Sequence, residues 1–199
     1  KILYHFGLYC ANTNSFHGTE YFLRENEIIP EDVSHLRYRG MGWPGLFSLT
    51  MKNGEKKTIK RGTTETDKKR RAKFSSAFHY DFQLPRCFTC NDLTAELADI
   101  SFADPWNKKF IGKENVGKSM LVVRNKIGDE LLKLAANMGA IVLEEADPEE
   151  VARSQNVDFK QGAQSRLRAL HFLGKATPRY IGKIQKVNVR YMWNLVFHV

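Results

Sequence analysis

A strand–helix–strand pattern between residues 119 and 143 limits the chain to folds that combine helices with a sheet. Ser119–Arg124 is an apolar run of strand length, and Ile127–Met138 has apolar residues at i, i+3, i+4 and i+7 counted from Leu131. Gly139 then ends the helix, and Ala140–Leu143 is a second apolar run. The pattern predicts a β-α-β unit at about 119–143 and an α/β (α+β mixed) fold, in which a mixed sheet has flanking helices.

A β-hairpin at about 46–60 is the clearest local feature outside that unit. Leu46–Met51 and Lys56–Lys60 are strand-like runs on either side of Asn53 and Gly54. An Asn-Gly pair readily adopts the positive φ angles of a type I′ turn, which joins antiparallel strands tightly. We therefore predict two antiparallel strands joined by that turn.

The positive charge is concentrated in one stretch of the chain. The formal net charge is +9, and Lys52–Lys73 alone holds ten Lys or Arg residues against three acidic ones, Glu55, Glu65 and Asp67. A local basic strip indicates one anionic contact, either with a partner or with a phosphate- or carboxylate-bearing cofactor. A solvated basic loop would show the same composition.

Length and composition predict a globular chain with a substantial core. Its 199 residues, of which 42% are hydrophobic, suit one domain at 1–175 with a C-terminal extension, 176–199, that packs on the core or on a partner. No apolar run approaches the roughly 18 residues of a membrane span. The chain opens in a strand-like run without an initiator Met, so we expect a further portion upstream.

Two of the three cysteines form a Cys-x-x-C pair. Cys87 and Cys90 lie in RCFTCNDLTAELADISFADPW, and Cys10 follows the strand-like run Ile2–Tyr9. Such a pair suits a zinc half-site, a redox disulfide or part of an iron–sulfur ligand set, and Cys10 is the natural third thiolate. Three cysteines make a poor disulfide framework, which favours reduced thiols or metal ligands and a cytoplasmic location.

Two glycine-containing stretches raise the question of phosphate binding. The loop RGMGWPG at Arg39–Gly45 has backbone amides that can approach a phosphate and a tryptophan that can cover a flat ring, but by itself the sequence favours a tight structural turn over a nucleotide site. Gly112–Ser119 has the spacing of a Walker A loop, but it leads into a strand instead of a helix, so we reject a P-loop. No Ser/His/Asp constellation emerges, and no catalytic residue is assigned.

Several of these segments together resemble the coenzyme F420 hydrogenase/dehydrogenase beta-subunit family, in its C-terminal domain. The resemblance rests on CFTCNDLTAELADISFADPW, GKSMLVVRNKIG at Gly117–Gly128, FGLYCANTNSFHGTEYFL and YRGMGWPG, and it spans roughly residues 5–160. It implies an iron–sulfur flavoprotein subunit that passes electrons between a 4Fe–4S cluster and FAD. It also implies hydride exchange with the deazaflavin coenzyme F420, inside a hydrogenase or formate dehydrogenase-like complex.

The resemblance also implies roles for individual residues. Cys10, Cys87 and Cys90 would be cluster ligands, and the family's fourth cysteine belongs to a Gly-Thr-Pro-Cys motif that this sequence lacks. The positions expected to bind cofactor are Asn12, Ser15, Gly40, Trp43, Asp99, Ser101, Asp104, Arg124 and Lys160.

A second hypothesis explains the same residues without redox chemistry. A zinc ion held by the cysteines would staple a basic, non-enzymatic α/β module, and the basic strip would bind nucleic acid or another anionic partner. Flavin together with iron and sulfide would favour the first hypothesis. Zinc with salt-dependent polynucleotide binding would favour the second.

Overall fold

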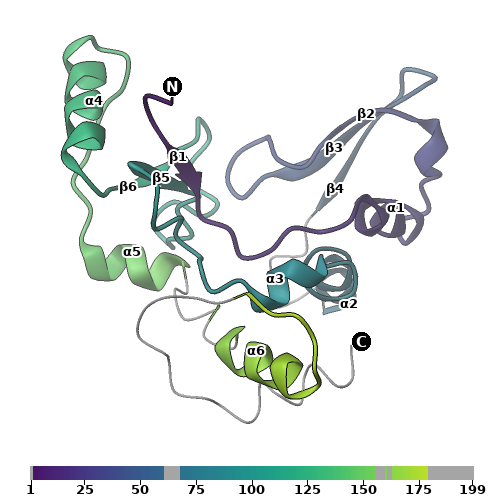
Figure 1. The fold of residues 1–199 in the computed structure, drawn as a ribbon. Coiled ribbons are helices and arrows are strands. Elements are labelled where there is room, and N and C mark those ends of the chain that lie inside the picture. The colour runs from purple at the N-terminus through teal and green to yellow at the C-terminus, as the bar shows by residue number, and fades with distance from the viewer. Residues whose placement is uncertain (1, 61–67, 156–159, 161–162, 179–199) are drawn as a thin grey trace. The chain divides into compact units, whose positions relative to one another are not determined.

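The computed structural model describes residues 2–60, 68–155, 160 and 163–178, and Figure 1 shows their elements in chain order. Contacts divide the chain into two compact units. The first unit comprises Lys1–Ala11, Pro85–Pro105 and Ser119–Val199, and the second comprises Asn12–Leu84 and Trp106–Lys118. The predicted domain at 1–175 includes parts of both units and stays a prediction, and 179–199 of the predicted extension lie outside the described residues.

The first unit contains a three-stranded mixed sheet in the order β1-β5-β6 (Figure 1). Its strands are β1 (Phe6–Leu8), β5 (Ile100–Ala103) and β6 (Met120–Val123). β1 runs parallel to β5, and β5 runs antiparallel to β6. The predicted mixed sheet with flanking helices is thereby confirmed.

Four helices in the described part of the chain belong to the first unit, and α4 lies where the sequence predicts a helix. They are α3 (Pro85–Thr89), α4 (Lys126–Asn137), α5 (Pro148–Gln155) and α6 (Ala163–Phe172). α4 begins at Asn125, whose side chain accepts the Gly128 N–H at 3.0 Å, and the Asp147 carboxylate accepts the Glu149 N–H at 3.0 Å before α5. These side chains satisfy backbone donors that the first helical turn leaves unpaired.

The third element of the predicted β-α-β unit is wrong. Ala140–Leu143 forms no strand, and Val142 is 92% exposed. β6 is an edge strand whose described partner is β5, so after α4 the chain does not return to a ladder that could order these residues. An apolar tetrapeptide becomes a strand only through hydrogen bonds to a neighbouring strand.

The second unit contains an antiparallel sheet that packs against helices carrying buried phenylalanine side chains. Its strands are β2 (Val33–Arg37), β3 (Leu46–Met51) and β4 (Lys56–Lys60), in that order. α1 (Phe16–Arg24), the 3₁₀ turn η1 (Pro30–Asp32), α2 (Lys68–Ser75) and the π-helical turn η2 (Ser76–Tyr80) complete it. Phe22 is fully buried and lies 4.8 Å from Phe47 between ring centroids. This cluster of phenylalanines forms the core of the unit.

The hairpin at 46–60 is confirmed, but its turn differs from the prediction. Leu46 pairs with Lys60 and Thr50 with Lys56, and the loop between the strands spans four residues. Gly54 has φ +86°, whereas Asn53 is not among the residues with positive φ. The Asn53 side chain instead accepts the Glu55 N–H at 2.9 Å, as in an Asx turn, which removes the need for a type I′ conformation.

Candidate functional site

The three cysteines come from two segments of the first unit that a backbone hydrogen bond holds together. Cys10 follows β1, and its N–H donates to the Leu93 carbonyl at 2.9 Å. Cys87 lies in α3 and Cys90 directly after it, and the Cys90 N–H donates to the Cys87 carbonyl at 3.4 Å. Cys10 therefore lies beside the chain just beyond the Cys-x-x-C pair, although 76 residues lie between Cys10 and Cys87 in the sequence.

The thiols differ in exposure. Cys10 is exposed, while Cys87 and Cys90 are half-buried, and the Cys90 thiol lies 3.5 Å from the Asp92 carbonyl oxygen. Among the described residues, no three His, Cys, Asp or Glu side chains converge as a metal site would require. By residue type the three thiols fit an iron–sulfur cluster. Ligation would need them to turn toward one point and would need a fourth donor.

A close backbone approach fixes β1 over the segment that follows the cysteine pair. A Cβ placed on Gly7 would lie 2.3 Å from the Ala95 Cβ and 2.9 Å from the Ala98 Cβ. No side chain fits there, because real carbon atoms do not approach so closely. The absence of a side chain at Gly7 thus sets the distance between β1 and residues 95–98. It thereby also influences the position of Cys10, which lies three residues after Gly7.

Asp99 connects three segments of the first unit. Its carboxylate accepts the His5 N–H at 2.7 Å and the Asn125 side-chain amide at 2.6 Å. Asn125 in turn caps α4, and Gly128 packs so closely on the Asp99 carbonyl that an added Cβ would be 2.6 Å from its oxygen. The hydrogen bonds from Asn125 and His5 lower the pKa of Asp99, although partial desolvation opposes them. The carboxylate is therefore held ionised.

Arg124 is the centre of a second cluster of polar contacts, next to that of Asp99. Its Nε donates to the buried Ser101 hydroxyl at 3.0 Å, and its Nη2 donates to the Thr94 carbonyl at 2.8 Å. Tyr9 lies against the same guanidinium; burial raises the pKa of Tyr9, while the positive charge and hydrogen bond of Arg124 oppose that rise. Asp99, Ser101 and Arg124, each predicted to bind cofactor, thus lie together, but these contacts join protein groups to one another.

In the second unit, Gly40 and Trp43 lie in a loop that packs on Trp106. The ring centroids of Trp43 and Trp106 are 4.7 Å apart, and the Arg39 guanidinium lies 4.9 Å from the first and 5.3 Å from the second. Two backbone hydrogen bonds hold the loop at Trp43. The backbone N–H of Trp43 donates to the Glu114 carbonyl, and the Trp43 carbonyl accepts the backbone N–H of Gly112. Sequence patterns do not predict this pairing of loops.

The indole nitrogen of Trp43 has an unusual environment. Its Nε1 is buried and has no hydrogen-bond acceptor among the described residues. Leaving a buried donor unpaired is costly, typically about 1–3 kcal/mol. Native proteins seldom accept that cost without a reason, and an acceptor from a bound group would remove it.

The remaining predicted positions are scattered over both units. The Asn12 side chain donates to the Phe78 carbonyl at 2.9 Å, and Ser15 caps α1 through the His17 N–H. Asp104 is exposed and Lys160 is buried. Asn12 and Ser15 therefore make contacts that stabilise the second unit.

The Walker-like stretch has its amides occupied by the chain itself. The Glu114 carboxylate accepts the N–H groups of Val116 and Gly117 at 2.9 and 3.1 Å. These two bonds are the main cause of the lowered pKa of Glu114. The stretch then leads into β6, so a carboxylate of the chain takes amides of the kind that would hold phosphate in a P-loop.

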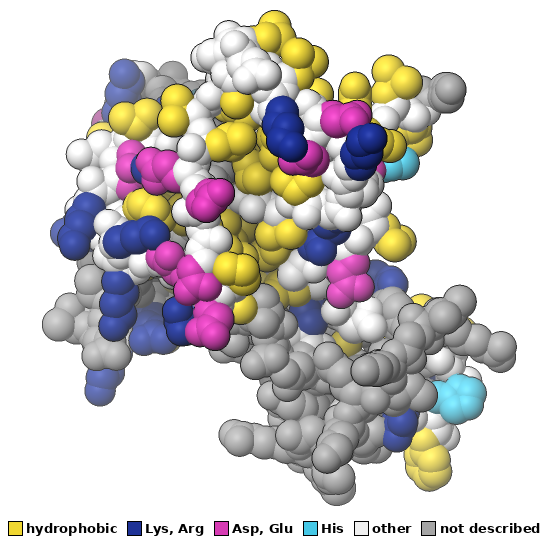
Figure 2. Space-filling view, turned by 90° about the vertical axis from the view of Figure 1, so that its left-hand side faces the viewer, with side chains coloured by type: hydrophobic (Ala, Val, Ile, Leu, Met, Phe, Trp, Pro, Cys, Tyr) yellow, Lys and Arg dark blue, Asp and Glu magenta, His cyan; other side chains and the backbone are white. Residues whose placement is uncertain are grey.

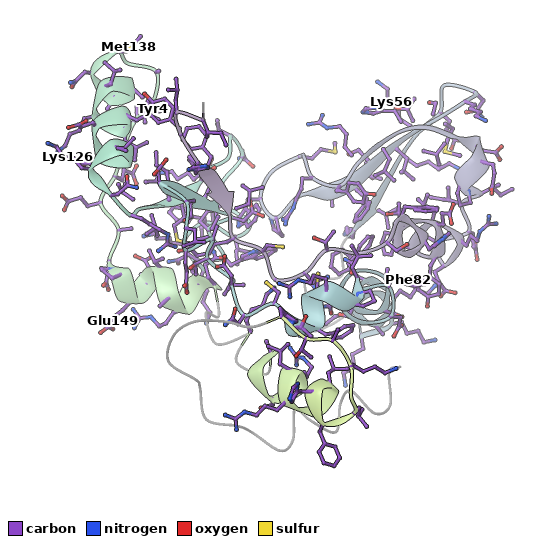
Figure 3. The ribbon with its side chains drawn as sticks, viewed as in Figure 1. Tyr4, Lys56, Phe82, Lys126, Met138 and Glu149 are labelled. Carbon is purple, nitrogen blue, oxygen red and sulfur yellow. The ribbon has the colours of Figure 1, made fainter. Side chains whose placement is uncertain are left out.

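Figure 3 shows how side chains project from the two units, and Figure 2 shows that the face bearing α4 and α5 carries both acidic and basic side chains. On α4, Lys133 lies 2.6 Å from Asp129, and on α5, Arg153 lies 3.2 Å from Glu149. In the basic strip, Lys57 pairs with Glu55 and Lys73 with Glu25, while Lys68 and Lys69 begin α2, which has no acidic residue in its first turn. No described helix is long and apolar enough to cross a membrane.

Comparison with known proteins identifies the family. A family model for coenzyme F420 hydrogenase/dehydrogenase, covering the C terminus of the beta subunit, matches residues 1–149, about three quarters of the chain. The chain belongs to this family. The resemblance in the cysteine, glycine-loop and Gly117–Gly128 motifs is thereby confirmed, and the family is one of oxidoreductase complexes.

A solved structure supports the fold of this beta-subunit domain. The chain is similar to one in the F420-reducing [NiFe] hydrogenase complex from Methanosarcina barkeri, studied by xenon derivatization, with a TM-score of 0.51 and 17% sequence identity. The match covers 90% of this chain and 55% of that chain, so the present chain spans little more than half of its structural relative. A comparison with curated protein sequences gives no match.

The lowered pKa of Asp99 predicts a loss of stability in acid. The ordinary pKa of an aspartate is about 3.9, and the folded value lies below it. Asp99 therefore stabilises the fold fully above that pH, and its contribution disappears as the pH falls through the folded pKa. We expect the free energy of unfolding, measured by urea titration, to fall less steeply below about pH 4 in Asp99→Asn than in the parent protein. Equal slopes would contradict this assignment.

Proposed function

We propose that the chain is part of an iron–sulfur flavoprotein subunit that transfers electrons between a 4Fe–4S cluster and FAD. The subunit would exchange a hydride with coenzyme F420 inside a hydrogenase or dehydrogenase complex. The observation that supports the proposal is the hydrogen bond from the Cys10 N–H to the Leu93 carbonyl, which joins the segment of Cys10 to the chain three residues after Cys90. The family match over residues 1–149 gives that region its redox context.

Cys10, Cys87 and Cys90 would hold the cluster, with a fourth ligand from outside the chain. A cluster exchanges single electrons and a flavin exchanges one or two, so the pair can link one-electron carriers to a hydride carrier. The cofactors would carry the electrons, and the role of the protein would be to fix the positions of the thiols and to exclude water. Gly7 and the Cys10–Leu93 hydrogen bond would fix the position of Cys10.

For the flavin, the loop at Gly40 and Trp43 is better suited than the group around Asp99. The oxygens of Asp99 already accept from His5 and Asn125, and Arg124 donates to Ser101 and Thr94. Trp43, by contrast, has a buried N–H that lacks an acceptor within the described part of the chain. A flavin presents carbonyl oxygens that could accept from it, and Arg39 beside the ring supplies positive charge.

The proposed partners are other subunits of a redox complex, and nucleic acid is not among them. The structural relative is itself a chain of a hydrogenase complex. Lys68 and Lys69 on α2 give the second unit an anion-binding surface that suits an acidic cofactor tail or an acidic partner equally. The proposed location is the cytoplasm, where thiols such as these stay reduced.

The ligand assignment predicts the metal content of variants. Cys87→Ser, made in the natural full-length protein and purified without oxygen, should lose most of its iron and sulfide because serine is a poor ligand for a cluster. Asn91→Ser is the matched control, since it lies beside the pair and removes no thiol. Iron, sulfide, zinc and flavin are counted on each sample.

Full iron in the Cys87→Ser variant would overturn the ligand assignment. A colourless parent protein that contains zinc and no flavin would overturn the redox proposal itself. Polynucleotide binding that weakens with salt would then indicate the basic strip as the functional surface.

The unpaired indole predicts opposite effects on flavin affinity and on stability. Trp43→Phe keeps an aromatic ring and removes the buried N–H. We expect flavin to bind about tenfold more weakly, as for the loss of one hydrogen bond. The flavin-free protein should be no less stable, because an unsatisfied donor is lost with the indole.

Flavin affinity is measured by titrating the flavin-free protein with FAD while monitoring fluorescence quenching. The stability of the flavin-free protein is measured by thermal unfolding. Trp106→Phe is the control, since it changes the neighbouring ring of the same pair. Unchanged flavin affinity in Trp43→Phe would remove Trp43 from the proposed site.

A further inference from the structure

The carbonyl at the centre of the Cys-x-x-C turn is bound by a residue that lies far along the chain. Arg166, on α6, donates from Nε to the Phe88 carbonyl at 2.6 Å. Phe88 lies between Cys87 and Cys90, and its carbonyl belongs to the last turn of α3. Carbonyls of a last helical turn have no partner within their own helix, and a guanidinium is a strong donor for such a group.

The rest of the turn is closed by its own side chains. The Thr89 hydroxyl donates to the Arg86 carbonyl at 3.0 Å, and the Arg86 guanidinium donates to the same hydroxyl at 3.0 Å. Thr89 is itself buried. The two residues between the cysteines therefore have their polar groups held, one locally by Arg86 and one from a distance by Arg166.

α6 has the packing needed to act as a support. Ala163, Ser165 and Leu167 are buried, so the helix is anchored on the side next to Arg166, and Figure 1 shows α6 near α3. A donor on an anchored helix holds its acceptor more firmly than one on a free loop. Moreover, α6 lies outside residues 1–149, the part that matches the family.

We propose that Arg166 is a positioning residue for the cysteine site: α6 fixes the Cys87–Cys90 turn through the Phe88 carbonyl and so keeps two thiols in place to bind a cluster. This inference rests on the proposed function for the identity of the bound group. The hydrogen bond and its effect on the turn do not depend on that identity. The region of the chain beyond the family match is thereby part of the site.

The test compares Arg166→Met with Arg168→Met in the natural full-length protein. Methionine keeps the apolar stem and removes the donor, and Arg168 is an exposed arginine of the same helix. In metal-free protein, amide hydrogen exchange over residues 87–91 should become about tenfold faster in Arg166→Met, as for the loss of a hydrogen bond to a charged donor. Arg168→Met should match the parent.

A second readout is the rate at which a chelator removes iron from the loaded protein. We expect it to rise about tenfold in Arg166→Met, to return partly in Arg166→Lys, which keeps a donor, and to stay unchanged in Arg168→Met. Unchanged exchange over residues 87–91 in Arg166→Met would overturn the inference. If the parent protein contains no iron but exchange over residues 87–91 is still faster in Arg166→Met, the proposal of a bound cluster is overturned. The support of the turn by Arg166 would then still stand.

Discussion

The Asp99 carboxylate is the interaction on which the architecture of the first unit depends. One oxygen accepts the backbone N–H of His5, just before β1, and the other accepts the side chain that caps α4. A single buried charge thus connects the chain start, β5 and the helix after β6. Because hydrogen bonds to an ionised acceptor are the stronger kind, these contacts can order segments that have little apolar surface to share. Gly7 and Gly128 complete the arrangement by allowing backbone to approach where no side chain fits.

The position of Cys10 follows from that arrangement. β1 has three residues and lies at the edge of its sheet, so pairing with β5 alone gives it few hydrogen bonds. The bond from His5 to Asp99 at its start and the bond from Cys10 to Leu93 at its end hold it in register. Cys10 is consequently placed by contacts outside the strand, whereas Cys87 and Cys90 are placed by α3 and by Arg166. The two halves of the thiol set depend on different supports.

Local patterns in the sequence predicted much of the fold. The hairpin at 46–60 and the helix expected at 127–138 depend on residues within a few positions of one another, and each forms as a short-range unit. The strand expected at Ala140–Leu143 failed because strand formation depends on a partner, which an apolar run does not reveal. The type I′ turn failed because the Asn53 side chain bonds locally instead of letting Asn53 take a positive φ.

Long-range contacts account for the rest of the site. Nothing local to Trp43 indicates that it packs on Trp106, or that residues 106–118 return to the second unit. The family resemblance implied that Asp99, Ser101 and Arg124 bind cofactor, and the structure brings these three residues together. Their hydrogen-bond partners, Tyr9, Thr94 and Asn125, lie on other segments, and only the helix-capping position of Asn125 could have been read from the sequence. Parallel pairing of β1 with β5 spans more than ninety residues, which periodicity does not encode.

The central claim is that one carboxylate holds together the start of the chain, the end of β1 that carries Cys10, and the cap of α4. Residue-resolved amide hydrogen exchange on Asp99→Ala, compared with the parent protein, tests it most directly. If the claim is correct, protection falls together at His5, Cys10, Arg124 and Gly128, because losing the carboxylate frees the chain start, the end of β1 and the cap of α4. If protection falls at His5 alone and Cys10 exchanges as in the parent protein, the segments are held by other contacts and the claim is wrong.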